Sequence, residues 1–316
     1  MREAVIAPGV HAQNQGGRSF AWRAGALAPQ FVWAVAAGQL ALGISAAVAA
    51  IAQSSPLPLA EYFHLQAPVF LFTLAAVEYC LSIVAWRLFG RGDPLRSAWL
   101  LIMMSAACRA MALLAACVLD RAAGAAWRSG PEAAKAQAEA GRELAMAVGN
   151  PFSLALLAAG LFVVIRQYKR LGLMRRLGRK HLVPMAAVAV FLGAEICELA
   201  GRLASAHAPV GASALLRWTT GPLLGVLMLE AVLLRGAVVS AGDSLVSRCW
   251  GAYAAAVFLV ATGQMGLWVL GSGRLPLELS YSNSLVWLMG GLAFTMAAAC
   301  QVAAIARART PRAPAS

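Results

Sequence analysis

The stretch FLGAEICELAGR, residues 191–202, places charged side chains inside an apolar run that extends from about 182 to 206. A run of this length can cross a lipid bilayer as one helix. Glu195, Glu198 and Arg202 are three and four residues apart, so they share one face of that helix. An ionised side chain in hydrocarbon is costly unless it is paired or hydrated. We therefore expect this face to turn toward other helices.

Seven further apolar runs surround this stretch in the sequence. Hydrophobic residues make up 61% of the 316 positions and charged residues only 12%, whereas soluble domains carry about 25% charged residues. None of the runs alternates as the strands of a membrane barrel do. The sequence therefore predicts an all-α, polytopic membrane protein with eight transmembrane helices, at about 30–52, 67–89, 97–119, 150–168, 182–206, 214–236, 249–271 and 283–306.

The basic residues are distributed unevenly between the two sides of such a bundle. The tails and links on the side of both termini carry 18 Lys and Arg residues, against five on the other side. The positive-inside rule then predicts that both termini are cytoplasmic and that the protein resides in the cell (inner) membrane. This topology explains the net charge of +13, so we expect the lipid bilayer as a partner and no nucleic acid.

The links between the runs suggest a simple domain organisation. We expect a disordered cytoplasmic tail at 1–29, a transmembrane bundle at 30–306 and a cytoplasmic tail at 307–316. The longest polar link, 120–149, is predicted to be an external helical segment that begins near Pro131 and Glu132. The motif Ala50-Ile51-Ala52 resembles a signal-peptidase site, which leaves processing of the N-terminus as an alternative.

Charged residues also lie inside other predicted spans. At about 1.5 Å per helical residue, Arg109 is level with Glu78 and Glu195, whereas the remaining three lie nearer the outer face. Three acids and three arginines could neutralise one another. We therefore predict one internal network of Glu78, Arg109, Glu195, Glu198, Arg202 and Arg217. It could fasten the bundle, line a cavity for a polar ligand or solute, or handle protons.

A short motif occurs twice on the predicted cytoplasmic side. The link GDPLRSAW ends at Trp99, the link GDSLVSRCW ends at Trp250, and each follows a run with one glutamate, Glu78 or Glu230. This fits two parallel four-helix halves. The alternative is that a Gly-Asp turn and an interfacial tryptophan occur twice by chance. With Trp86, both tryptophans are expected to form an aromatic belt at the inner membrane boundary.

Sequence motifs of the common enzyme classes do not occur in this chain. There is no HExxH, GxSxG or Walker pattern, and the six cysteines include no CxxC pair, so we predict no catalytic residue, metal or cofactor. We expect a non-enzymatic receptor, sensor or partner-binding bundle, with a polar small molecule or a membrane protein as partner. The Gly-Asp-x-Leu-Arg-x-x-Trp turn resembles membrane sensor regions of bacterial signalling proteins. The alternative function is transport of a small anionic or zwitterionic solute through the same cavity. A membrane enzyme that acts on polar lipid headgroups through the Glu/Arg cluster is a further alternative.

Overall fold

The computed structural model describes residues 15–309 apart from 56–57, 59–61, 63–65, 130–131, 175–178, 206–211, 239–244 and 272–276. Within this part, only the backbone is described at residues 15–27, 120–129, 132–139, 142–143, 180, 202–203, 205, 212–217, 237–238, 267–271, 277–282 and 309. Within that part the chain forms eight long helices and no strand: α1 (Gln15–Ala52), α3 (Ala67–Leu88), α4 (Leu95–Ser129), α5 (Glu132–Arg170), α6 (Leu182–Ser205), α7 (Ala212–Val238), α8 (Leu245–Gly271) and α9 (Leu277–Arg309), with a short 3₁₀ turn, η2 (Arg179–His181). Each long helix contains a segment long and apolar enough to cross a membrane. The predicted all-α fold with eight spans is confirmed.

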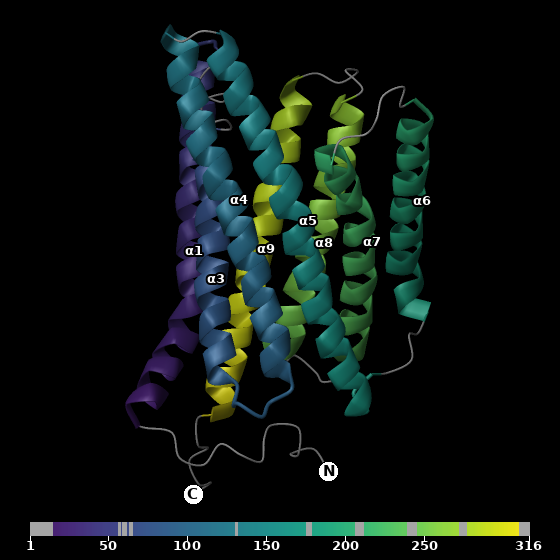
Figure 1. Cartoon of the computed structure of the whole chain (residues 1–316). Coiled ribbons are helices and arrows are strands. Elements are labelled where there is room, and N and C mark those ends of the chain that lie inside the picture. The colour runs from purple at the N-terminus through teal and green to yellow at the C-terminus, as the bar shows by residue number, and fades with distance from the viewer. Residues whose placement is uncertain are drawn as a thin grey trace, which may run out of the picture.

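Successive helices run in opposite directions along the bundle, so the start of α1 and the end of α9 lie at the same end (Figure 1). α1 and α6 stand at opposite edges, with the other helices between them. This alternation follows from short links that return the chain directly to the neighbouring position. In one such link, Asp93 accepts a hydrogen bond from the backbone N–H of Leu95 at 2.8 Å and so caps α4.

Several helices are longer than their apolar runs predicted. α1 begins at Gln15, so residues 15–29 are helical and the expectation of a disordered tail over 1–29 is wrong for them; residues 1–14 lie outside the described part. The expected external segment 120–149 is the continuation of α4 to Ser129 followed by the first half of α5, which does start at Glu132 as predicted. Hydropathy marks where lipid ends, whereas a helix continues through polar residues with good helix propensity.

The packing of the helices repeats in the two halves of the chain. In the first half α3 packs against α4, and in the second half α7 packs against α8. Each of these helices also contacts the last helix of the other half, α3 with α9 and α7 with α5. Likewise, α4 pairs with α5 and α8 pairs with α9. α4 and α8 begin at Leu95 and Leu245, the same position of the repeated Gly-Asp-x-Leu motif. The outer helices differ, because α1 packs on α9 whereas α6 packs on α7. The contacts support two parallel four-helix halves.

Small residues bring α4 and α5 close together. A side chain added at Gly149 would lie 2.3 Å from Cβ of Ala112. Between them Ser105 Oγ donates to the Ser153 carbonyl at 2.7 Å, and Ser153 Oγ donates to the Ser105 carbonyl at 3.0 Å. Such contacts are a main source of helix association in lipid, where burial of apolar surface adds little.

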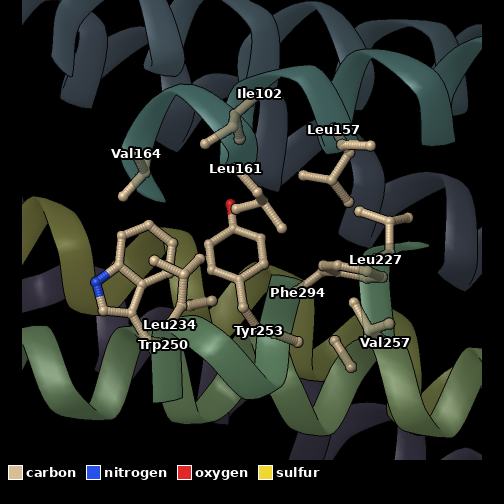
Figure 2. Packing of buried hydrophobic residues seen from close by; sticks show 14 of the residues in the cluster. Ile102, Leu157, Leu161, Val164, Leu227, Leu234, Trp250, Tyr253, Val257 and Phe294 are labelled. Carbon is tan, nitrogen blue, oxygen red and sulfur yellow. The ribbon is translucent and has the colours of Figure 1, made fainter. Parts of the chain in front are cut away.

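An apolar cluster fills the centre of the bundle between α4, α5, α7, α8 and α9 (Figure 2). Trp99 and Trp250 belong to it and are only 1% and 2% exposed, so the expectation that these two form a lipid-facing belt is wrong. Each tryptophan lies about one turn inside its helix, and Trp250 contacts Tyr168 in the last turn of α5. Neighbouring helices therefore cover positions that hydropathy alone assigns to the boundary.

Candidate functional site

An ion pair joins α3 and α4 in the middle of the bundle. Nη2 of Arg109 donates to Oε2 of Glu78, whose side chain is 2% exposed. Glu78 lies at the centre of the span Ala67–Leu88, and Arg109 is near the centre of Leu95–Leu119. Two opposite charges at this depth each lower the cost of burying the other.

Aromatic rings from the second half of the chain cover this pair. The guanidinium carbon of Arg109 lies 4.6 Å from the centre of the Phe294 ring of α9, a cation–π distance. Phe294 in turn meets Tyr253 of α8 edge to face, with ring centres 5.8 Å apart, and Figure 2 shows the two rings side by side. The Glu78–Arg109 pair therefore lies between the two halves, with its carboxylate and guanidinium from the first and its aromatic cover from the second.

The aromatic contacts continue toward the end of α5. Trp250 stacks on Tyr253 with ring centres 5.6 Å apart, and its indole N–H donates to the hydroxyl of Tyr168 at 3.2 Å. Tyr168 lies in the last turn of α5, next to Lys169 and Arg170. A continuous line of contacts thus connects the buried ion pair with the basic end of the bundle.

Arg109 remains partly accessible although it lies at the middle of the membrane. Its side chain is 19% exposed, against 2% for Glu78. It is in helical register with Ile102 and Ala116, which are buried, whereas Met104 and Met111 on the opposite side of α4 are exposed. The side chain of Arg109 therefore starts from the face of α4 that is turned to the other helices. Among the described residues Glu78 is its one hydrogen-bond acceptor, although arginine has five N–H donors.

On α3, α8 and α9, three buried polar side-chain atoms have no hydrogen-bond partner in the part of the chain that the structure describes. They are Oγ of Ser82, the hydroxyl of Tyr253 and Oε1 of Gln301. Ser82 lies one turn after Glu78 on the same face of α3, and Tyr253 lies within electrostatic range of both Glu78 and Arg109. Because buried polar groups are nearly always satisfied, these atoms could contact a polar ligand.

Glu195 occupies a different place, on the peripheral helix α6. Its carboxyl group rests on Gly221 of α7, where an added Cβ would lie 1.8 Å from the carboxyl carbon. Leu192 fits against Gly225 in the same way, at 2.1 Å. α6 packs on α7 at the edge of the bundle and makes no comparable contact with α3 or α4 within the described part (Figure 1).

The six residues of the predicted network are thus distributed over at least two places. The structure joins Glu78 with Arg109 and sets Glu195 against α7; Glu198 is half-buried on α6. The side chains of Arg202 and Arg217 lie outside the described residues. A single network of all six remains a prediction.

Sequence reasoning missed the neighbours that shape both places. Tyr253 and Phe294 stand in apolar runs, where nothing distinguishes them from ordinary core residues. The glycines of Gly221-Pro222-Leu223-Leu224-Gly225 do carry a signal, because Gly-x-x-x-Gly marks close helix approach in membranes.

These features define an integral membrane protein, an eight-helix bundle with an arginine–glutamate pair at the level of the membrane centre. No group of three or more His, Cys, Asp or Glu side chains among the described residues is arranged to hold a metal ion. No protein-family model, curated protein or solved structure matches the chain.

Proposed function

We propose that this protein is a non-enzymatic membrane receptor or sensor that binds a small anionic or zwitterionic molecule at Glu78 and Arg109. The observation that supports this most is Arg109 itself. It lies at the middle of a span and on the interior face of α4, remains 19% exposed, and has one hydrogen-bond acceptor among the described residues for its five donors. An arginine that served only to neutralise Glu78 would not need accessible donors.

The chemistry of the pair suits a carboxylate or phosphate group. A guanidinium offers a planar fork of donors that matches either anion, and its hydrogen bonds strengthen where water is scarce. Glu78 can accept a hydrogen bond from the ammonium group of a zwitterion. The hydroxyls of Ser82 and Tyr253, which lack partners among the described residues, add neutral polar contacts nearby.

Binding at this place could be transmitted to the membrane surface. An anion that takes donors of Arg109 weakens its hold on Glu78, which joins α3 to α4. The anion also weakens the contact of Arg109 with Phe294. From Phe294, contacts through Tyr253 and Trp250 continue to Tyr168 at the end of α5. A ligand shifts a conformational equilibrium only through such differential contacts.

Transport of the same solute is the second candidate, and the repeated packing favours it. Many transporters consist of two structural repeats, with the solute site near the bilayer midplane between them. Here α3 and α7 have equivalent neighbours, and the ion pair meets side chains of both halves. A third alternative is that the pair only fastens the bundle.

A ligand screen on the purified protein tests the proposal. Carboxylates, phosphates and amino acids are added to the protein in lipid nanodiscs and the melting temperature is followed. Arg109→Lys keeps the charge but loses the planar fork, and Arg91→Lys in the exposed α3–α4 link is its matched control. We expect at least one anion or zwitterion to raise the melting temperature of wild type and Arg91→Lys more than that of Arg109→Lys.

Flux measurements then separate the candidates. The stabilising compound is offered to proteoliposomes in radiolabelled form. Binding without uptake supports a receptor or sensor, whereas uptake that Arg109→Lys reduces supports transport. If no compound stabilises the protein, or if Arg109→Lys responds like wild type, the ion pair is not a ligand site.

A further inference from the structure

Glu230 is a second buried acid at membrane depth, and it is distant in sequence from the residues of the proposed ligand site. It lies on α7 within the span Trp218–Gly236 and is 7% exposed. Its Oε2 atom has no hydrogen-bond partner among the described residues.

The helices that pack on α7 are α5, α6 and α8, and their facing stretches contain almost no charge. The segment 151–165 of α5 and the segment 182–194 of α6 contain no titratable residue, and 251–268 of α8 contains only Tyr253. These three segments therefore supply no cation to Glu230.

Several other ionisable groups of α5, α7 and α8 lie toward the basic end of the bundle. On α7 itself, Arg235 donates to the backbone carbonyl of Ser247 at 3.3 Å. Arg166 and Arg248 are exposed near the ends of α5 and α8. Tyr168 accepts the indole N–H of Trp250, and Cys249 is a buried thiol.

The repeated packing shows what this acid lacks. α3 and α7 are equivalent in the two halves, and each carries one buried glutamate, Glu78 or Glu230. Arg109 follows the start of α4 at Leu95 by 14 residues, and the residue 14 after Leu245 is Leu259. The first half thus pairs its carboxylate with an arginine, whereas the second half places leucine at the corresponding position.

We propose that Glu230 is a proton-binding site. An ionised carboxylate without a cation or donor is far more costly in apolar surroundings than the neutral acid. The carboxylate accepts a proton from a hydronium ion, which forms an O–H bond and leaves water; the reverse step returns the proton to water. Glu230 lies eight residues before the end of α7, about 12 Å along the helix, so the basic end is the nearer aqueous side. The site is independent of the ligand site at Glu78 and Arg109.

Infrared spectroscopy of the carboxyl group tests this directly. Spectra of wild type, Glu230→Gln and Glu78→Gln are recorded in nanodiscs at neutral pH, in water and in deuterium oxide. We expect a protonated-carboxyl band in wild type that persists in Glu78→Gln, is lost in Glu230→Gln and fades as the pH is raised. Absence of the band in wild type, or its full retention in Glu230→Gln, would overturn the proposal.

A labelling experiment on wild type avoids any dependence on how the variants fold. Hydrophobic carbodiimides react with protonated carboxyl groups, and peptide mass spectrometry identifies the modified residue. At neutral pH we expect modification of Glu230 and little of Glu78, which is ion-paired. Equal or lower labelling of Glu230 would contradict the proposal. Protection of Glu230 by sodium at constant ionic strength would also contradict it, because the ligand would then be a metal cation.

Discussion

At the scale of single residues, the cost of burying charge decides the interior. Arg109 and Glu78 each need a partner at the middle of the membrane, and the structure gives each to the other. Removing one member of a buried pair is costly because the remaining charge loses its compensation. Removing both leaves only a change in shape.

A double-mutant cycle tests this reasoning. We expect Arg109→Gln to lower the free energy of unfolding by about 3–5 kcal/mol, because Glu78 would be left buried without its cation. The double variant Glu78→Gln, Arg109→Gln should recover much of that loss. Denaturant unfolding in detergent measures both, with the exposed Arg91→Gln as control. An Arg109→Gln protein as stable as wild type would show that the pair does not stabilise the bundle.

The two tyrosines of the aromatic line offer a matched comparison. Tyr168→Phe removes an acceptor of the Trp250 indole N–H and should cost about 1 kcal/mol. Tyr253→Phe removes a buried hydroxyl without a described partner, so it should leave stability unchanged or raise it. Melting temperatures of the ligand-free proteins distinguish them. A larger loss for Tyr253→Phe than for Tyr168→Phe would mean that the Tyr253 hydroxyl has a hydrogen-bond partner.

At the scale of helices, attachment of α6 depends on glycine. Glu195 and Leu192 project from α6 onto Gly221 and Gly225, positions where α7 offers no side chain. α6 packs on α7 but makes no comparable contact with the other long helices among the described residues. This one contact therefore determines how firmly α6 joins the bundle.

Two alanine substitutions separate this contact from a general effect on the helices. Gly221→Ala would force the carboxyl group of Glu195 away and should cost about 1–3 kcal/mol, as overpacking does. Gly193→Ala on α6 meets nothing within 4 Å and should be neutral or slightly stabilising. Thermal unfolding gives the stabilities, and hydrogen exchange shows whether α6 loses protection first. Equal effects of both substitutions would contradict a specific α6–α7 contact.

At the scale of the whole molecule, eight alternating helices place both ends of the bundle's chain on one side (Figure 1). The distribution of Lys and Arg predicts which side of the bundle faces the cytoplasm. The α3–α4 link with Arg91 belongs to the basic side, and Ser54 after α1 belongs to the opposite side.

Cysteine accessibility checks this orientation in intact cells. A membrane-impermeant maleimide should label Ser54→Cys from outside and Arg91→Cys only after the membrane is opened. Both positions are exposed, and wild type measures the background of the native cysteines. Labelling of Arg91→Cys in intact cells, without labelling of Ser54→Cys, would show that both termini face outward.

Much of the architecture could be predicted from the sequence because insertion into lipid is a local property. Each apolar run reveals a span by its own hydropathy, and Pro131 with Glu132 marked the start of α5. The prediction failed where a helix extends beyond its apolar run, as at 15–29. It also failed where neighbouring helices bury a residue near a helix end, as at Trp99 and Trp250.

The sequence by itself determined the eight spans, the basic side and the presence of acids and arginines that must avoid lipid. The tertiary structure decided which of them meet: Arg109 with Glu78 under Phe294, Glu195 on Gly221, and Glu230 among helix segments without charged residues. The physical reason is that hydropathy belongs to one segment at a time. The partner of a buried charge depends instead on the rotation and register of helices distant in the chain, which side-chain packing sets.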